Sequence, residues 1–230
     1  MEPLDGIVLA GGKSRRLGVD KALLSLGGAP LLQTVVQRVS QVCPRVIVAV
    51  DRPGRYRRLG LPARFVADAS PGLGPLAGLQ SGLQACATAH ALVVACDLPF
   101  LNVELLRYMA GLPRSYQALV PRSAGRDHPL HAVYARSCLP EVDALLAVGG
   151  GSMQQLLDRL DVRRLDERDL RRFDPDGLSL LNLISFLISF PGGAVTDRVG
   201  RKAVLLPGML LLGLGTLLLA GISDYWMVMV

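Results

Sequence analysis

The chain has few aromatic residues, few lysines and no closely spaced cysteines. Only 5% of its 230 residues are aromatic, so no ladder of rings is present on which nucleic-acid bases could stack. The net charge of +6 comes without a long run of Lys or Arg, which disfavours nucleic acid and suits a small anionic substrate. The four cysteines, at positions 43, 86, 96 and 138, form no C-x-x-C pair. This spacing suggests neither a zinc site nor a disulfide framework, and we interpret the cysteines as core residues in a reducing compartment.

The first residues also lack the pattern of a secretory signal. Met1 to Asp5 carries two acids and no basic residue, whereas such signals begin with a positively charged region. We therefore expect the first part of the chain to fold in the cytoplasm.

A glycine turn after a short apolar run is the most informative feature that is present. Ile7–Leu9 predicts a buried strand, and Gly11 and Gly12 follow it closely. Glycines let backbone N–H groups approach an anion without a Cβ atom in the way. Four cations accompany this turn: Lys13, Arg15, Arg16 and Lys21. The pattern predicts a cradle for a polyphosphate, and the alternative is an ordinary strand-to-helix turn with a solvated basic face.

Lysine is scarce elsewhere in the chain. Three lysines, at positions 13, 21 and 202, stand against 22 arginines, and two of the three belong to the glycine-turn segment. An ammonium is a compact point charge, whereas a guanidinium is a planar fork. The distribution hints that an ammonium is needed near the turn.

Apolar segments of two periodicities alternate along the chain. Strands are predicted near residues 7–9, 46–50, 91–95 and 118–120, and helices near residues 31–42, 79–87 and 103–109. This alternation predicts an α/β fold with a mostly parallel sheet and helices on both faces. Ligands of such sheets bind at the carboxyl ends of the strands. The glycine turn and Asp97, which follows residues 91–95 closely, are expected at that same edge.

Four motifs then give a family resemblance. The segment Leu9-Ala10-Gly11-Gly12-x-Ser14-x-Arg16-Leu17-Gly18-x-Asp20-Lys21 resembles the signature of nucleotidyltransferases that activate sugars and cofactors. The chain is most similar to the molybdenum cofactor guanylyltransferases, from about Gly6 to Asn182. The other matching features are Asp68, the Gly72–Gly78 loop, Cys96-Asp97-Leu98-Pro99 and His128-Pro129-Leu130. The resemblance implies a Rossmann-like nucleotidyltransferase domain over residues 1–182. Its expected reaction transfers GMP from GTP to molybdopterin-bound molybdenum cofactor and releases pyrophosphate.

The resemblance also implies roles for individual residues. Lys21, Arg16 and Asp97 are the expected catalytic residues, and Asp97 is the expected ligand of Mg²⁺. The expected nucleotide-binding residues are Leu9, Ala10, Gly11, Gly12, Lys21, Asp68 and Asp97. Nucleotidyl transfer needs positioning and charge neutralisation and no covalent nucleophile, and a carboxylate at a strand end suits Mg²⁺. A plain surface lysine and a turn or helix-capping aspartate are the alternatives for Lys21 and Asp97.

A second group of residues is expected on the acceptor side. By the resemblance, His128 helps to hold the pterin substrate, with a turn role as the alternative, and Arg122 and Arg126 flank it and could meet the pterin phosphate. His128 and His131 are not expected to bind a metal, because three-residue spacing in an extended segment points the rings to opposite faces. Molybdoenzymes or cofactor-handling proteins are further candidate partners.

One position departs from the family pattern. Close relatives carry an asparagine at the end of the second strand, where this chain has Ala49. The departure puts one base-reading contact, and with it guanine selectivity, in question. The alternatives are a CTP-using or sugar-phosphate-activating enzyme of the same fold, or an inactive membrane-tethered adaptor.

The last quarter of the chain differs from the rest. Residues 177–196 and 203–223 carry no charge and have roughly membrane-spanning length. Residues 193–202 resemble a loop motif of major facilitator transporters, although two spans cannot form an alternating-access transporter. We expect residues 183–230 to form a hydrophobic helical tail with one or two transmembrane-like helices, the one part in contact with a membrane. A truncated, shifted or chimeric reading frame near Leu183 is the favoured explanation, and a membrane-tethered fusion is the alternative.

Overall fold

The computed structural model describes residues 3–11, 20–26, 28–52, 54–175 and 178–180. The chain divides into two units, Met1–Asn182 and Leu183–Val230, and all the described residues belong to the first. Predictions that concern Gly12, Arg16 and the tail of residues 183–230 lie outside the described residues. Within the described part, no helix is long and apolar enough to cross a lipid bilayer.

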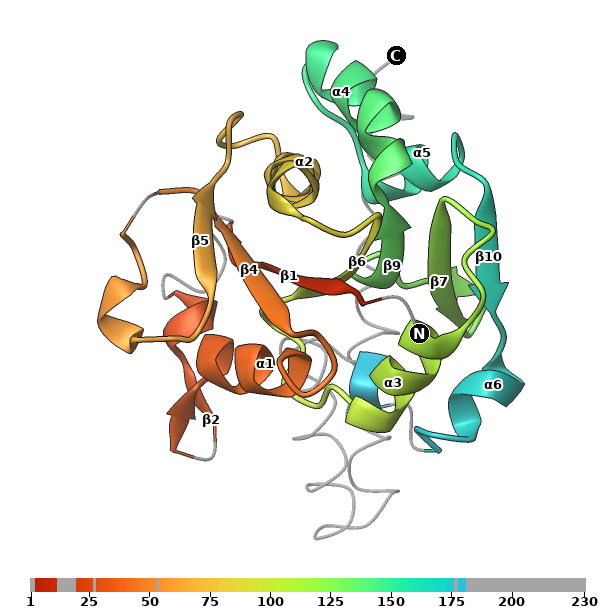
Figure 1. The fold of residues 1–230 in the computed structure, drawn as a ribbon, viewed down its shortest axis with the longest axis horizontal. Helices are drawn as coiled ribbons and strands as arrows, with labels where there is room; N and C mark the ends of the chain where they lie inside the picture. Colours follow the sequence, from red (N-terminus) through yellow and green to blue (C-terminus); the bar gives the residue numbers. More distant parts are fainter. Residues whose placement is uncertain (1–2, 12–19, 27, 53, 176–177, 181–230) are drawn as a thin grey trace, which may run out of the picture. The chain divides into compact units, whose positions relative to one another are not determined.

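A central sheet runs through the first unit (Figure 1). Its strands lie in the order β10-β7-β9-β6-β1-β4-β5, and β8 pairs with β7. Their bounds are β1 Asp5–Leu9, β4 Arg45–Val50, β5 Arg64–Ala67, β6 His90–Ala95, β7 Ala118–Ser123, β8 Arg126–Asp127, β9 His131–Ala135 and β10 Val162–Leu165. The pairs β1–β4, β1–β6, β4–β5 and β10–β7 are parallel, whereas β9 runs antiparallel to β6 and β7. The predicted mostly parallel sheet is confirmed. A short antiparallel pair, β2 (Ser25–Leu26) and β3 (Ala29–Pro30), lies apart from it.

Helices cover both faces of the sheet, as predicted (Figure 1). Helices α1 (Leu31–Val39) and α3 (Val103–Gly111) pack on one face. Helices α2 (Pro75–Ala85), α4 (Leu139–Ala147) and α5 (Met153–Leu157) pack on the other. The remaining elements are α6 (Glu167–Arg171) and the 3-10 turns η1 (Lys21–Leu23), η2 (Arg57–Leu59), η3 (Arg136–Cys138) and η4 (Leu178–Leu180).

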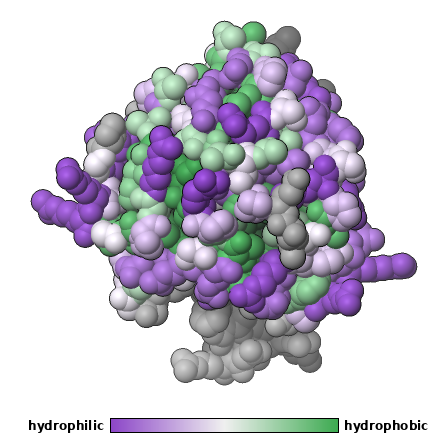
Figure 2. Space-filling model, viewed as in Figure 1, coloured by the Kyte–Doolittle hydropathy of each residue, from purple (hydrophilic) through white to green (hydrophobic). Residues whose placement is uncertain are grey.

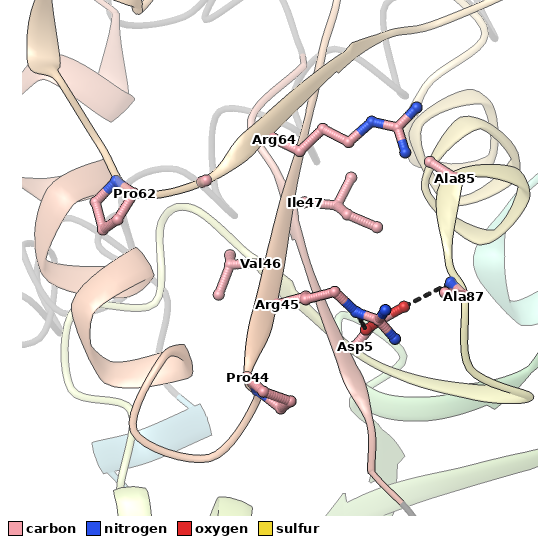
Figure 3. A pocket seen from close by; sticks show the side chains of 10 residues that line it. Asp5, Pro44, Arg45, Val46, Ile47, Pro62, Arg64, Ala85 and Ala87 are labelled. Carbon is pink, nitrogen blue, oxygen red and sulfur yellow. Dashed lines mark hydrogen bonds and ion pairs between the residues drawn. The ribbon is translucent and has the colours of Figure 1, made fainter.

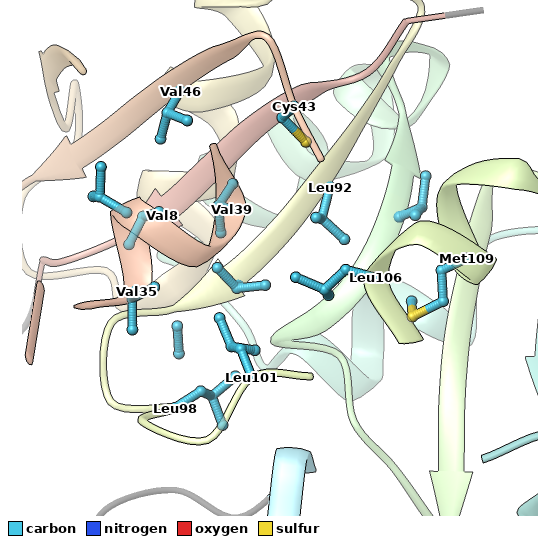
Figure 4. Close-up of a cluster of buried hydrophobic side chains, with 14 of the residues drawn as sticks. Val8, Val35, Val39, Cys43, Val46, Leu92, Leu98, Leu101, Leu106 and Met109 are labelled. Carbon is cyan, nitrogen blue, oxygen red and sulfur yellow. The ribbon is translucent and has the colours of Figure 1, made fainter. Parts of the chain in front are cut away.

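The core under α1 shows why its sequence forms a helix. Its apolar residues recur three and four positions apart, so they form one stripe along the helix. These residues, Leu31, Leu32, Val35, Val36 and Val39, are all fully buried. Figure 4 shows Val35 and Val39 beside Val8 of β1, with Leu92 of β6 and Leu106 of α3 in the same cluster. The face of the unit in Figure 2 carries mostly hydrophilic side chains, with hydrophobic atoms between them.

Two glycines let α2 lie close to β1. A Cβ atom at Gly82 would come within 2.6 Å of Ile7 Cγ2, and one at Gly78 within 3.1 Å of Leu9 Cδ2. The first contact is too short for a Cβ atom while position 7 is isoleucine, so the glycine lets α2 pack closely on this strand. The helix begins after Gly74, whose φ of +78° is a conformation that favours glycine.

The amino-terminal edge of the sheet holds an ion pair between a buried carboxylate, that of Asp5, and the exposed Arg45 (Figure 3). The Asp5 carboxylate is 1% exposed and accepts hydrogen bonds from Arg45 Nε at 2.7 Å and from the backbone N–H of Ala87 at 2.7 Å and of Thr88 at 3.3 Å. Burial alone would raise the pKa of Asp5, but Arg45 and the two N–H groups hold it below its usual value. A cavity of about 370 Å³ opens beside this pair.

Candidate active site

The carboxyl-terminal edge of the sheet forms a pocket of about 250 Å³. Strands β1 and β6 are parallel neighbours with Leu9 opposite Ala95, so the segments that follow them emerge side by side. Ala10 N–H donates to Ala49 O at 2.9 Å and Cys96 N–H donates to Leu9 O at 3.1 Å, which continues the pairing beyond the strands. The pocket is lined by Leu9, Ala10, Gly11, Asp20, Lys21, Ala22, Gly74, Pro75, Ala95, Cys96, Asp97 and Leu130.

The structure brings Lys21 and Asp97 together in this pocket. Lys21 Nζ lies 3.2 Å from Asp97 Oδ2, and the two side chains are 23% and 21% exposed. Lys21 begins the 3-10 turn η1, whereas Asp97 follows β6. The ammonium and the carboxylate therefore meet in the pocket, although they come from distant parts of the chain, and both remain partly accessible to a ligand.

Asp68 lies beside the start of the glycine turn. A Cβ atom at Gly11 would come within 2.9 Å of Asp68 Oδ2, so a side chain at position 11 would force the carboxylate to move. Asp68 Oδ1 is buried and has no hydrogen-bond partner among the described residues. Burial and then the negative charge of Asp51 raise the pKa of Asp68 to about 6. The carboxyl group thus lies close to the backbone that is expected to meet the nucleotide.

A network of four side chains behind Lys21 was not predicted from the sequence. Asp20, Asp51, Arg55 and Tyr56 are joined by hydrogen bonds and ion pairs. Asp51 could have been found, because it follows the apolar residues 46–50 as Asp97 follows those of β6. Arg52, Arg57 and Arg58 nearby are exposed, whereas the side chain of Arg55 is only 19% exposed.

Two other residues differ from their expected surroundings. Ala49 does not end its strand: it is fully buried in β4, and its Cβ lies 3.5 Å from the position of a Cβ on Gly78. Cys96 was interpreted as a core residue, but it follows β6 and is half-buried in the pocket wall. Burial and then the charge of Asp97 raise the pKa of its thiol to about 12. All four cysteines are free thiols.

The residues expected on the acceptor side lie around the β7–β8 hairpin. His128 Nε2 lies 2.7 Å from Ser123 Oγ, and His128 N–H donates to Pro121 O. Arg122 Nε lies 3.8 Å from Asp127 Oδ1, and Arg164 of β10 pairs with the same carboxylate at 3.1 Å. Arg122 therefore already has a carboxylate partner, and its contact with a pterin phosphate remains a prediction.

The two histidines differ in environment. His131 begins β9 and is 1% exposed, and burial lowers its pKa to about 3.

No group of three His, Cys, Asp or Glu side chains in the described part of the chain could hold a metal ion. Asp97 is a carboxylate that follows a strand end and is about a fifth exposed in the pocket. This donor fits Mg²⁺, which commonly takes one or two carboxylates and completes its shell with phosphate oxygens and water.

Ligands of α/β proteins with parallel strands bind at the carboxyl edge of the sheet, and Lys21 and Asp97 place a cation and a carboxylate there. The comparison with protein families makes the class specific, because the model of the "MobA-like NTP transferase domain" matches residues 6–165. The chain belongs to this family and is a nucleotidyltransferase.

Individual relatives match over most of their length. The chain is 34% identical over 194 residues to the "Probable molybdenum cofactor guanylyltransferase" of Pelotomaculum thermopropionicum, covering 84% of this chain and 91% of the relative. It is 33% identical to the molybdenum cofactor guanylyltransferase of Desulfosudis oleivorans, covering 80% and 91%. The crystal structure of molybdopterin-guanine dinucleotide biosynthesis protein A from Archaeoglobus fulgidus superposes with a TM-score of 0.69 at 28% identity, covering 78% and 92%.

Proposed function

We propose that this chain transfers GMP from GTP to the molybdopterin-bound molybdenum cofactor and releases pyrophosphate. The observation that carries the proposal is the contact of Lys21 Nζ with Asp97 Oδ2 at 3.2 Å in the pocket beyond β1 and β6. The family model spans both residues, because it matches residues 6–165, and relatives named for this reaction match 80% or more of the chain.

The reaction needs a terminal phosphate oxygen of the acceptor to attack the α-phosphorus of GTP. The bond between that phosphorus and the bridging oxygen breaks, and pyrophosphate leaves with the electron pair. Lys21 neutralises the negative charge that grows on the α- and β-phosphate oxygens. Gly11 offers a backbone without a side chain, against which the triphosphate lies. Arg16 and Gly12 complete the phosphate contacts in this proposal.

Asp97 is the residue that would hold Mg²⁺. When bound, the ion neutralises the charge of the phosphate oxygens and holds the triphosphate in one orientation. With the Asp97 carboxylate holding the ion, the ammonium of Lys21 would be available to the phosphate oxygens. Both side chains are about a fifth exposed, so Lys21 can change partner without rearrangement of the core.

Base recognition in this chain falls to residues other than the one at position 49. The side chain of Ala49 is buried under α2, so it makes no contact with a base. The backbone of Leu9, Ala10 and Gly11 and the carboxyl group of Asp68 are then the groups that meet the guanosine. Because position 49 offers no amide to read guanine, CTP is kept as the second candidate substrate.

Binding and turnover of the two nucleotides separate these candidates. The full chain, with Mg²⁺ and either GTP or CTP, is heated to measure the melting temperature, and pyrophosphate release is measured with molybdenum cofactor present. A ligand that binds the native state raises the melting temperature with its concentration relative to Kd. GTP is expected to raise it more and to support release. A larger shift and faster release with CTP would overturn guanylyl transfer in favour of cytidylyl transfer.

The tail is a separate proposal that rests on its sequence. Residues 183–230 are a hydrophobic unit distinct from the nucleotidyltransferase domain of residues 1–182, and the join near Leu183 comes from a chimeric or shifted frame. The reaction takes place in the cytoplasm, where GTP and Mg²⁺ are supplied. Long-read sequencing of the native transcript across codons 178–200 tests the join, and an uninterrupted frame would contradict it.

A further inference from the structure

We propose that Arg55 and Tyr56 are positioning residues that fix the Asp20-Lys21 segment to the edge of the sheet, so that the ammonium of Lys21 is held at the phosphate site. The inference rests on the proposed function, because the aim of Lys21 matters only if a triphosphate binds there. Neither residue lines the pocket, so neither is a catalytic residue.

Arg55 bridges two acidic residues that come from different parts of the chain, Asp20 and Asp51. Its Nε donates to Asp20 Oδ2 at 3.0 Å, and its terminal nitrogens lie 2.9 Å from Asp20 Oδ2 and 2.5 Å from Asp51 Oδ1. The three side chains are 17% to 22% exposed. Burial alone would lower the pKa of Arg55, but the two carboxylates hold it above its usual value. Asp51 follows β4 directly, so the guanidinium ties Asp20 to the rigid sheet.

Tyr56 adds a second tie to the same aspartate. Its hydroxyl lies 3.1 Å from each oxygen of Asp20 and 3.3 Å from Ala10 O, and the residue is 2% exposed. Burial and then the charge of Asp20 raise the pKa of Tyr56, so the hydroxyl stays protonated and donates. The Arg55 guanidinium also lies over the ring, 5.3 Å from its centroid. Tyr56 therefore links the Asp20-Lys21 segment to the chain just beyond β1.

The position of Asp20 determines where the side chain of Lys21 lies. It is the residue before Lys21 and caps η1, because its Oδ1 accepts from Ala22 N–H at 3.1 Å. With Asp20 held by Arg55 and Tyr56 and turned by its cap, Lys21 emerges in a direction that reaches Asp97. Without Arg55, the carboxylates of Asp20 and Asp51 would repel each other. The segment would then move away from the sheet, and Lys21 would move with it.

Substitutions at Arg55 test the inference through the affinity for Mg²⁺-GTP, measured by calorimetry on the full chain. Arg55→Met is expected to raise Kd about tenfold, and Arg55→Lys, which keeps the charge and loses the fork, to recover part of the loss. Arg58 is exposed, lies on the same connection and forms no ion pair with the described residues. Arg58→Met is therefore the matched control and is expected to leave Kd unchanged within about twofold.

A double-mutant cycle separates positioning from general loss of structure. If Arg55 acts through Lys21, Arg55→Met has no further effect on Kd in a Lys21→Ala background, whereas a merely structural role would weaken binding again by the same factor. Tyr56→Phe keeps the buried ring and is expected to raise Kd a few-fold, which keeps the test valid if Arg55→Met does not fold. Equal effects of Arg55→Met with and without Lys21, or a Kd equal to that of the Arg58→Met control, would overturn the inference. If the unsubstituted chain itself fails to bind Mg²⁺-GTP, the proposed function fails instead.

Discussion

Each of the two edges of the sheet carries an ion pair between an acidic and a basic side chain. The two carboxylates differ in burial and in the number of groups that donate hydrogen bonds to them. At the amino edge, Asp5 is 1% exposed and accepts from Arg45 and two backbone N–H groups. At the carboxyl edge, Asp97 meets Lys21 at one 3.2 Å contact, and about a fifth of each side chain is exposed. A buried charge with several donors stabilises the fold because removing it strands its partners. A charge that is about a fifth exposed and has one exchangeable partner is available for chemistry.

The largest effect is expected for a substitution of Asp97, the carboxylate at the carboxyl edge of the sheet. Asp97→Ala is expected to lower pyrophosphate release from GTP by about 10²- to 10³-fold, because a group that holds charge in place during the reaction is lost. The free energy of unfolding should change by about 0–1 kcal/mol, since the ion pair has a single contact and is still reached by solvent. Activity and urea unfolding are measured on the same preparation. Retained activity, or unfolding that parallels the loss of activity, would contradict the assignment.

The opposite result is expected at Asp5. Asp5→Asn should lower the free energy of unfolding by about 2–3 kcal/mol, because Arg45 and the Ala87 N–H lose a charged acceptor. The native pKa of Asp5 is below that of the unfolded chain. Its contribution is therefore complete above the unfolded pKa and is lost as the pH falls through the native pKa. Urea unfolding at pH 7 and pH 3 should show the gap between variant and parent narrowing at the lower pH.

Activity provides the control for Asp5. GTP affinity of Asp5→Asn is expected to stay unchanged at a temperature where the variant is folded, because Asp5 lies at the far end of β1 from the pocket. A Kd weakened tenfold or more in the folded variant would show that the two edges are coupled.

The smallest effect is expected for a substitution of Asp68, a second carboxyl group at the carboxyl edge of the sheet. Its native pKa is about 6 against an ordinary value of 3.8, so the native state holds the proton more tightly than the unfolded chain. The free energy of unfolding therefore falls as the pH rises from about 4 to 6. Asp68→Asn cannot ionise and should melt a few degrees higher than the parent at pH 7, with no difference below about pH 4. A gap that grows toward low pH would have the wrong sign.

The sequence predicted the interior strands of the sheet better than its outer or antiparallel ones. Strands β1, β4 and β6 are buried on both faces and appear as continuous apolar runs. Strand β10 exposes Arg163 and Arg164 at the sheet's edge, so it has no apolar run to recognise. Strand β9 follows the His-Pro segment and was missed because nothing local marks an antiparallel return.

The residues of the candidate site also differ in whether the sequence indicated them. Lys21 and Asp97 were predicted because they belong to motifs beside predicted strands. Arg55 was missed because Arg52, Arg57 and Arg58 surround it in sequence and are exposed. Which arginine of such a segment turns inward depends on Asp20, 35 residues earlier. Such a long-range partner leaves no periodic signal in the sequence.

The contact of Gly82 with Ile7 predicts a correlated exchange among relatives. A methyl group at position 82 would overlap the isoleucine branch, and trimming that branch to valine or alanine would restore the room. Family members with alanine at position 82 should therefore carry a smaller residue at position 7. Placing isoleucine at position 7 of such a relative should push α2 away from β1. Gly74 and Pro75, at the start of α2, line the same pocket as Lys21 and should move out of its wall.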